Sequence, residues 1–387
     1  MSEAGDLRVA FAASLADVDA DQWDALAGND YPFLRHRFLY GLERSGCTSA
    51  DTGWQPCHAL LWRGDDLLAL LPLYLKDHSW GEYVFDWAWA DAWRRMGLNY
   101  YPKLVSAIPF TPATGPRLCC APDFAAEQAW PLLLQGIRSL SEQQGISSWH
   151  LLFPERATSN ALAEAGYPQR LAVQFHWLNN GYRSFDDFLA TFASRKRKNL
   201  RRERARVAEQ GLTLRRLQGS AITPEHWRRF HRFYQLTYAK RSGHGGYLSE
   251  AFFTDVAPAL GEQVMMVVAE QAASPVAAAL YFRSGDTLYG RYWGCEQEYD
   301  CLHFEACYYQ GIEYCIEHGL QRFDPGAQGE HKIQRGFTPV YTCSNHWIAD
   351  ERLAAAVADF AKDEAGHIAQ YREEAAELLP FKSAPAG

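Results

Sequence analysis

The chain has 387 residues, of which 48% are hydrophobic and 22% are charged, and its formal net charge at pH 7 is −8. These values are typical of globular proteins and exclude wholesale disorder, and the length suits two domains better than one core. The negative net charge argues against a general nucleic-acid coat, but it leaves room for a local basic site.

No segment of the sequence is typical of secretion or of a membrane span. Residues 1–6 are small and acidic, without the basic start and apolar run of a signal peptide. The most apolar stretch, Leu67–Leu75, contains Pro72 and is far shorter than the roughly 20 residues of a spanning helix. The nine cysteines show no C-x-x-C spacing that would indicate a zinc site. We therefore expect a cytoplasmic protein that binds no metal.

The first half of the chain predicts a mixed α/β unit, because helical and strand patterns alternate along it. The expected helices are Val18–Leu26, Arg37–Arg44, Trp130–Gln143 and Ser159–Ala165. The expected strands are Ala59–Trp62, Leu67–Tyr74 and Ser148–Phe153. The turn Arg63–Asp66 joins the first two strands into a hairpin.

Charged side chains lie among aromatic ones in two segments of this half. The segments are GEYVFDWAWADAW, Gly81 to Trp93, and YYPKL, Tyr100 to Leu104, and the proline-rich PFTPATGPR, Pro109 to Arg117, follows them. A small-molecule cleft needs aromatic walls with a few charged groups, although packed core aromatics give the same pattern. The candidate residues for binding an acceptor molecule are Glu82, Asp86, Tyr101, Lys103, Phe110 and Thr111.

The second half repeats this order of elements. The expected helices begin at Ser184 and cover Arg195–Gln210, Pro224–Tyr238 and His303–His318. The expected strands are Leu212–Leu217, Val264–Glu270, Val276–Arg283, Thr287–Trp293 and Gln321–Asp324. The repetition suggests a duplicated architecture, although no repeat is legible residue by residue.

The tail, from residue 350 onward, predicts one amphipathic helix. Apolar residues fall on one face at steps of three and four, from Leu353 to Leu378. Such a helix either docks on its own domain or forms a contact between two copies of the chain.

The sharpest run of charge is SRKRKNLRRERAR, Ser194 to Arg206, which holds eight cations against one acid, Glu203. Cations on all sides of a helix repel one another unless anions neutralise them. The run therefore favours a phosphate-bearing partner, either RNA or a nucleotide-linked substrate, over a solvated face paired with acids elsewhere. The candidate residues for binding this donor are Arg195, Lys196, Arg197, Lys198, Arg201 and Arg202.

The loop PGAQGEHKIQRGF, Pro325 to Phe337, concentrates proton carriers and cations between glycines. His331 and Lys332 lie in it, and the preceding helix contributes Glu305 within HFEACYYQ, His303 to Gln310. The free backbone N–H groups of the junction Gly294–Leu302 suit an anion or a carbonyl oxygen that acquires charge. A solvated turn and a self-satisfied interior carboxylate remain the alternatives.

Together these motifs resemble the FemAB-like predicted N-acyltransferases, relatives of the Fem peptidyltransferases within the GNAT superfamily. The resemblance covers roughly Trp23 to Trp347. It implies an α/β (α+β) fold of two tandem GNAT-like domains, each a mixed central sheet flanked by helices, followed by a C-terminal helix. We place the first domain at residues 1–175, the second at 176–349, and the helix and tail at 350–387.

In the Fem enzymes an amino acid moves from aminoacyl-tRNA to an amine of a peptidoglycan precursor. A lysine in an F-K-x-x-x-G-like motif stabilises the charge on the carbonyl oxygen, and residues 331–337 fit that motif with His331 where an aromatic is usual. The resemblance therefore assigns the oxyanion partner to Lys332, with His331 and Glu305 as candidate bases. It also assigns the nucleic-acid-facing surface to the basic helix.

Two departures from the superfamily bear on the donor. Gly294–Leu302 lacks the glycines of the acyl-CoA motif, and no long helical hairpin interrupts the second half. We expect an N-acyl- or aminoacyltransferase with no tightly bound cofactor, a donor that is aminoacyl-tRNA or acyl-CoA, and an amine-bearing small molecule or peptide as acceptor, held between the domains. A non-catalytic module that binds tRNA or cell-wall precursors is the alternative.

Overall fold

The computed structural model describes residues 6–327 and 329–382. The chain divides into two compact units, which we call unit 1 (Met1–Ala172 and Tyr341–Ile368) and unit 2 (Val173–Val340 and Ala369–Gly387). Three elements contain residues of both units: β9 (Gln169–Leu178), β15 (Thr338–Ile348) and α11 (Glu351–Glu377). This division differs from the predicted boundaries, since α11 belongs partly to each unit and does not follow them as a separate segment.

Unit 1 contains two sets of paired strands. The first set has the order β1-β3-β4-β7 and is antiparallel throughout; its strands are Leu7–Ala12, His58–Arg63, Asp66–Leu71 and Cys119–Cys120. The second set continues from β15 in the order β8-β6-β5-β2, with strands Ser148–Leu152, Lys103–Ser106, Tyr74–Lys76 and Trp54–Pro56. Only β6 and β8 are parallel among these pairs, so the second set is mixed.

The hairpin predicted in the first half is confirmed, because Arg63 pairs with Asp66 across the turn. The expected strand Leu67–Tyr74 was too long. It ends at Leu71, and Tyr74 begins β5 in the other set of strands. Pro72 lies between them and has no N–H to donate to a neighbouring strand, which accounts for the break.

The helices of unit 1 alternate with these strands. They are α1 (Ala20–Ala27), α2 (His36–Arg44), α3 (Trp87–Arg95), α4 (Ala126–Gln144) and α5 (Arg156–Glu164), with short 3-10 turns at Leu15–Asp17 and Pro32–Leu34. The main core lies where α4 covers the strands, around Leu61, Leu71, Leu133, Ile137 and Trp149. Helix α3 was not expected from the sequence and packs Trp89 and Trp93 against Leu353 and Val357 of α11.

Unit 2 is built on strands in the order β10-β11-β12-β13-β14-β9. The first four are a consecutive antiparallel series, Leu212–Gln218, Val264–Gln271, Ser274–Arg283 and Thr287–Cys295. The short strand β14 (Arg322–Asp324) then pairs in parallel with β13 and antiparallel with β9. A parallel strand needs a crossover connection, and residues 296–321 supply it with helical structure.

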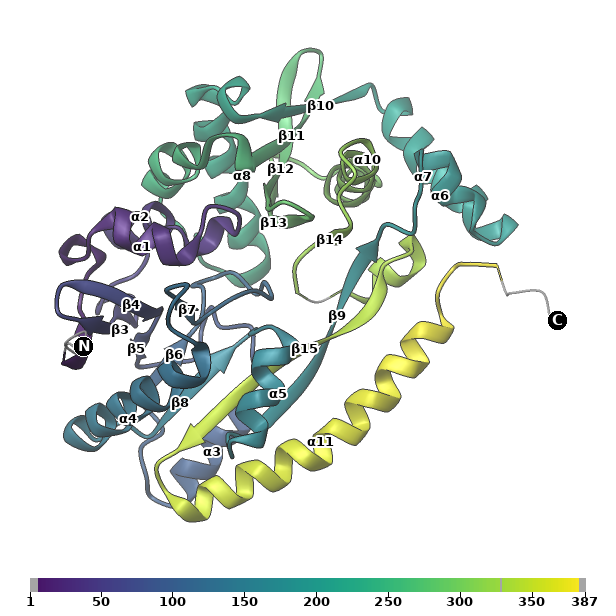
Figure 1. Cartoon of the computed structure of the whole chain (residues 1–387). Coiled ribbons are helices and arrows are strands. Elements are labelled where there is room, and N and C mark those ends of the chain that lie inside the picture. Colours follow the sequence, from purple (N-terminus) through teal and green to yellow (C-terminus); the bar gives the residue numbers. More distant parts are fainter. Residues whose placement is uncertain (1–5, 328, 383–387) are drawn as a thin grey trace. The chain divides into compact units, whose positions relative to one another are not determined.

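The helices of unit 2 are α6 (Phe185–Ala190), α7 (Ser194–Glu209), α8 (Pro224–Ser242), α9 (Leu302–Phe304) and α10 (Gln310–Glu317). Figure 1 shows α8 and α10 on either side of strands β11 to β13. On the α8 side, Gly294 of β13 allows close approach, since a Cβ there would lie 2.2 Å from the carbonyl carbon of Phe233. On the other side, Phe188, Tyr281, Ile312 and Phe323 belong to the core that α6, α7 and α10 cover.

The expected helix His303–His318 is present but is not regular. Glu305–Tyr309 forms a π turn, in which the N–H of Gln310 bonds to the carbonyl oxygen of Glu305, five residues earlier. Such turns are rare and often lie at functional sites. The predicted fold class, α/β (α+β) with mixed sheets flanked by helices and a C-terminal helix, is confirmed.

Candidate active site

The glycine-rich loop of unit 2 is anchored at its start by a side chain and turns at two glycines further on. After β14, the N–H of Gly326 bonds to Oδ1 of Asp324 at 2.9 Å. The chain then turns through Gly329, with φ of +106°, into a 3-10 turn, Glu330–Arg335, that ends at Gly336 with φ of +82°. Residues with a side chain rarely adopt these φ values, so glycine fits both ends of the turn that carries His331 and Lys332.

Lys332 lies inside this loop, 2% exposed. Its ammonium donates to the carbonyl oxygens of Gly326 at 2.7 Å and Ala327 at 3.5 Å. An ammonium has three hydrogens, and no other acceptor is bonded to it within residues 6–327 and 329–382. Burial lowers the pKa of Lys332 to about 8, and Arg291 adds to this while Asp324 opposes it. The group is therefore a cation at neutral pH with one donor left for a further oxygen.

Asp324 and Arg291 form a buried ion pair beneath the loop. The guanidinium of Arg291 lies 2.7 Å from Oδ2 of Asp324, and both side chains are 2% exposed. Burial alone would raise the pKa of Asp324, but Arg291, His176 and the Gly326 N–H together hold it below its ordinary value. His176 is 3.6 Å away, and burial lowers its pKa to about 4. Because Asp324 also accepts the Gly326 N–H, the pair holds the carbonyl that Lys332 bonds to.

His331 lies at the surface with its ring against aromatic side chains. Its Nε2 is 2.8 Å from the hydroxyl of Tyr308, and its ring packs on those of Phe304 and Tyr308. Desolvation of the ring, together with the charges of Lys332 and Arg335, lowers the pKa of His331 to about 4. The imidazole is neutral at pH 7 and has a lone pair for a proton.

Glu305, the second candidate base, is buried in an ion pair. Arg204 donates to its two oxygens at 2.9 and 2.8 Å, and Gln310 donates to one of them at 2.8 Å. Arg204 also pairs with Glu313 at 2.6 Å. No hydrogen bond joins Glu305 to His331 or Lys332 in the described part of the chain. The structure thus pairs Glu305 with Arg204 of α7 and not with either residue of the loop.

Helix α7 has an inner and an outer face. On the inner face Lys196 bonds to Gln334 of the 3-10 turn, and Glu203 accepts from Arg335 at 2.8 Å and also from Tyr309. Arg201 pairs with Asp186 at 3.2 Å. Four further cations of α7, which we call the outer cations, have no hydrogen bond or ion pair with the described residues. Arg195, Lys198 and Arg202 are exposed, and Arg197 is half-buried.

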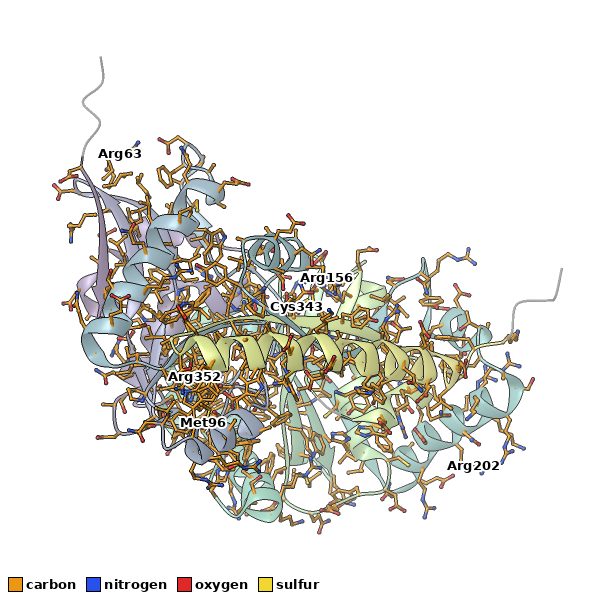
Figure 2. The ribbon with its side chains drawn as sticks, turned by 90° about the horizontal axis from the view of Figure 1, so that it is seen from below. Arg63, Met96, Arg156, Arg202, Cys343 and Arg352 are labelled. Atoms are coloured by element: carbon orange, nitrogen blue, oxygen red, sulfur yellow. The ribbon has the colours of Figure 1, made fainter. Side chains whose placement is uncertain are left out.

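Arg202 is exposed and lies on the outer side of α7, as Figure 2 shows. The predicted donor-binding residues are thus on one helix, and four of the six remain available to an anionic partner. The other two, Lys196 and Arg201, already bond to side chains of unit 2, namely those of Gln334 and Asp186.

In unit 1 the predicted acceptor-binding residues form a buried charge cluster. The ammonium of Lys103 bonds to Glu82 at 2.8 Å, to Ser79 at 2.8 Å and to Asp86. The hydroxyl of Tyr101 lies 2.8 Å from that of Ser79. Burial raises the pKa of Glu82 to about 7, with Asp86 adding to the effect and Lys103 opposing it.

One oxygen of each carboxylate, Oε1 of Glu82 and Oδ1 of Asp86, is buried without a hydrogen-bond partner in the described part of the chain. Phe110 packs on Trp54 at 5.3 Å, and the hydroxyl of Thr111 bonds to a carbonyl two residues earlier. The structure therefore joins Glu82, Asp86, Tyr101 and Lys103 in one cluster, and it also buries Phe110 and Thr111 in unit 1.

Sequence reasoning missed several charged residues of both units. Lys76 lies 3.7 Å from the ring centre of Trp54, and burial lowers its pKa to about 7. Arg291 and Asp324 were predicted only as strand residues and His176 lay in no predicted element, because their partners are far apart in the chain. The aspartate directly before Pro325-Gly326 was the one local signal, since aspartate commonly accepts the N–H two residues on in a turn.

The described residues contain no group of three histidine, cysteine or acidic side chains that could hold a metal ion. No helix in residues 6–327 and 329–382 is both long and apolar enough to cross a bilayer.

Comparison with known proteins identifies the fold and the family. A crystal structure of FemX matches with 12% identity, a TM-score of 0.50, and coverage of 82% of this chain and 93% of FemX. The C-terminal domain of a putative lysylphosphatidylglycerol synthetase from Agrobacterium fabrum matches with 11% identity, a TM-score of 0.50, and coverage of 90% and 97%. A tandem GNAT protein from the clavulanic acid biosynthesis pathway matches with 10% identity, a TM-score of 0.46, and coverage of 89% and 99%.

A search of curated protein sequences gave no significant match. The FemAB-like family, which is described by peptidoglycan biosynthesis or recognition, matches residues 14–383. Because this match covers nearly the whole chain, the resemblance found in the motifs is confirmed, and the protein belongs to the FemAB-like family.

Proposed function

We propose that the chain is an N-acyl- or aminoacyltransferase that forms an amide on an amine acceptor, with aminoacyl-tRNA as donor and a cell-wall precursor as acceptor. The observation that carries the proposal is the ammonium of Lys332, which is fixed by two carbonyls and keeps one donor for an oxyanion. Membership of a family described by peptidoglycan biosynthesis or recognition supports the acceptor class. FemX, a structure with the same fold, supports the reaction class.

In the proposed reaction the amine attacks the carbonyl carbon of the donor, and negative charge develops on the carbonyl oxygen. The tetrahedral intermediate then collapses to the amide as the ester bond to the tRNA breaks, and the ribose hydroxyl of the tRNA leaves with the proton that the amine gives up. A positioned cation next to the carbonyl oxygen lowers the energy of the transition state. Lys332 supplies the cation, and the pair Asp324–Arg291 keeps the loop in place by bonding to Gly326. No step requires a resident cofactor.

The attacking amine must lose a proton. His331 suits this role better than Glu305, because its imidazole is neutral and its side chain is exposed, whereas both oxygens of Glu305 are bonded to Arg204. A base with a pKa near 4 is weak, so His331 would pass the proton on once the tetrahedral intermediate has formed, when the nitrogen is far more acidic. Glu305 then holds Arg204 and α7 against the helix that carries Tyr308.

The donor and acceptor are assigned to separate surfaces. The outer cations of α7 (Arg195, Arg197, Lys198 and Arg202) would bind the phosphates of a tRNA. The buried cluster of unit 1 (Glu82, Asp86, Tyr101 and Lys103) and the neighbouring Phe110 and Thr111 would bind the acceptor. The unpartnered oxygens of Glu82 and Asp86 suit N–H donors of an amine.

The test is product formation with purified protein, followed by mass spectrometry of the acceptor. Aminoacyl-tRNA and acyl-CoA are offered in parallel with muropeptide precursors that carry free amines. Lys332→Ala should slow the reaction about a hundredfold or more, because one oxyanion donor is lost. The exposed Lys362 of α11 provides the control, and Lys362→Ala should leave the rate unchanged.

Transfer from acyl-CoA alone would replace the donor assignment. Ligand binding that survives Lys332→Ala, with no product from any donor, would show a non-catalytic binding module instead.

A further inference from the structure

An aromatic surface of unit 1 has no role in the proposed reaction. Ten large hydrophobic residues among those described are exposed, and five of them fall within residues 80–98. They are Trp80, Phe85, Trp87, Met96 and Leu98, with exposed fractions of 57%, 54%, 41%, 44% and 37%. Single exposed hydrophobic residues are ordinary, but a cluster marks an interaction site.

The members of this cluster lie on α3 or in the segments that flank it. The rings of Trp80 and Trp87 are 5.0 Å apart. The backbone oxygen of Phe85 accepts from Arg170, whose guanidinium also lies 5.5 Å from the ring of Phe360, itself 38% exposed. Met96 directly follows the last residue of α3 and is labelled in Figure 2.

Helix α3 is amphipathic in an unusual way, because both of its faces carry tryptophan. Trp89 and Trp93 are buried against α11, at 4% and 2% exposure. Trp87, Arg94 and Arg95 lie on the opposite side and are exposed. The inner face already anchors the helix, so the outer tryptophan is not needed to hold it in place.

The exposed side chains of residues 79–99 carry a positive charge in sum, although the chain as a whole is negative. Two of the three acids within residues 79–99, Glu82 and Asp86, are buried and bonded to Lys103. The third, Asp91, pairs with Arg94 at 2.7 Å. Arg95 is exposed, and the described residues provide it with no ion-pair partner. The surface therefore presents tryptophan and phenylalanine beside an unneutralised arginine.

We propose that this aromatic surface, Trp80, Phe85, Trp87, Met96 and Leu98 with Arg94 and Arg95, binds the interfacial region of an anionic phospholipid bilayer. Tryptophan suits the headgroup level of a membrane, and arginine adds attraction to anionic lipids. A chain of net charge −8 is repelled by such a bilayer elsewhere, so the local positive charge decides which face approaches. A symmetric dimer through the same patch is disfavoured, because it would place the two Arg95 side chains near each other.

The test is flotation of the full chain with vesicles, in which phosphatidylglycerol mixed with phosphatidylcholine is compared with phosphatidylcholine alone. The chain should float with the anionic vesicles, and Trp80→Ser/Phe85→Ser/Trp87→Ser should weaken the partitioning by at least about tenfold, since aromatic area is no longer removed from water. Brominated lipids should quench tryptophan fluorescence in the parent chain and not in Trp80→Phe/Trp87→Phe.

The matched control removes three exposed hydrophobic residues from unit 2, Leu178→Ser/Leu236→Ser/Leu378→Ser, and should float like the parent. Thermal unfolding of each variant shows whether it is folded, and Arg94→Ala/Arg95→Ala, which leaves the aromatic residues in place, should reduce binding to anionic vesicles alone. The proposal would be overturned if the parent chain did not float with anionic vesicles. It would also be overturned if Trp80→Ser/Phe85→Ser/Trp87→Ser floated as well as the parent. Light scattering that reveals a dimer abolished by the aromatic variant would also overturn it and assign the surface to a second copy.

Discussion

Lys332 is buried yet must remain a cation to act on an oxyanion. Burial brings its pKa to about 8, within reach of ordinary assay conditions. Its neutral form can still accept a proton but has lost the charge that stabilises the tetrahedral oxygen. The residue is therefore placed so that pH can switch its contribution on and off.

The transfer rate should accordingly fall as pH rises through about 8, because Lys332 loses its proton there. Lys332→Arg keeps its charge at every pH of the assay, so whatever activity it retains should show no decline near pH 8. The measurement is the pH profile of kcat for the parent and the arginine variant. The same alkaline decline in both chains would assign the ionisation to another group.

The Asp324–Arg291 pair should be a large contributor to the stability of unit 2. Asp324→Asn leaves the buried guanidinium of Arg291 without its counter-charge, and loss of one partner from a buried pair typically costs about 3–5 kcal/mol. Urea unfolding measures the free energy. Glu225→Gln, at the exposed ion pairs with Arg228 and Arg229, is the control and should change stability little.

The double variant Asp324→Leu/Arg291→Met separates stability from position. Replacing both charges by apolar groups should recover much of the lost stability, because no buried charge is left unpaired. It should not recover activity, since the N–H of Gly326 then has no carboxylate to hold the loop. Full activity in a stable double variant would show that the pair does not position Lys332.

At the scale of elements, α7 has two roles that the sequence does not separate: contact with other elements of unit 2 and the proposed binding of an anionic partner. In the sequence, the thirteen residues from Ser194 to Arg206 look uniformly basic. In the structure, Glu203, Arg204 and Lys196 face inward and bond to other elements of unit 2. Only the outer cations are available to a partner. Removing the outer cations should therefore alter binding without altering the fold.

Binding to aminoacylated tRNA across a salt series tests this division. Each phosphate contact contributes about 0.7–0.9 to the slope of log affinity against log salt, so Arg195→Ala/Arg197→Ala/Lys198→Ala/Arg202→Ala should flatten the slope by about 3. A control with the same change of charge on α8, at Arg228, Arg229, Arg232 and Lys240, should keep it. If the parent fails to bind at low salt, the tRNA assignment is lost.

The elements themselves were largely predictable, and their interruptions were not. Apolar periodicity predicted the hairpin between β3 and β4, the strands β10 to β13 and the helices α4, α7 and α8. It did not predict the π turn at Glu305–Tyr309, because a period of 3.6 continues on both sides of it. It also did not predict α3, in which six of the nine residues are aromatic or charged and alanine supplies the rest, so no ordinary apolar stripe is present.

The candidate site was predictable where one loop carries it and unpredictable where it depends on pairing across the sheet. Lys332 and His331 stand in a single glycine-bounded segment, so the sequence pointed to them. Arg291 and Asp324 lie 33 positions apart and meet only because β13 and β14 pair in parallel. Local sequence patterns do not predict such an ion pair between distant residues.

At the scale of the whole molecule, histidines make the folded state sensitive to acid. In unit 1, His150 and His346 are buried with their Nδ1 atoms 2.7 Å apart, and burial holds the pKa of each well below its ordinary value. Burial also lowers the pKa of His176 to about 4. The unfolded chain takes up these protons near pH 6.5, whereas the folded chain does so only at lower pH.

The free energy of unfolding should thus decrease as pH falls from about 6.5 toward 5, by up to about 1.4 kcal/mol per pH unit for each such histidine. Glu82 acts in the opposite direction and offsets the effect of about one histidine. Its raised pKa of about 7 lets the folded chain bind a proton in this range, which increases the free energy of unfolding as pH falls. Urea unfolding at pH 7, 6 and 5 measures the net effect. His150→Gln/His346→Asn should flatten the dependence, while His367→Gln on the exposed side of α11 should not.

The π turn at Glu305–Tyr309 sets the rotation of α10 about its own axis, and the contacts of the site depend on that rotation. Deleting a residue from Glu305–Tyr309 would let the backbone close as ordinary α-helix, and α10 would then rotate by about 100° and advance by about 1.5 Å. At present Glu305 meets Arg204 while Tyr308 meets His331 from the same short turn. Without the extra residue the helix could satisfy the first contact or the second but not both, so substitutions in this turn should be tolerated far better than changes in its length.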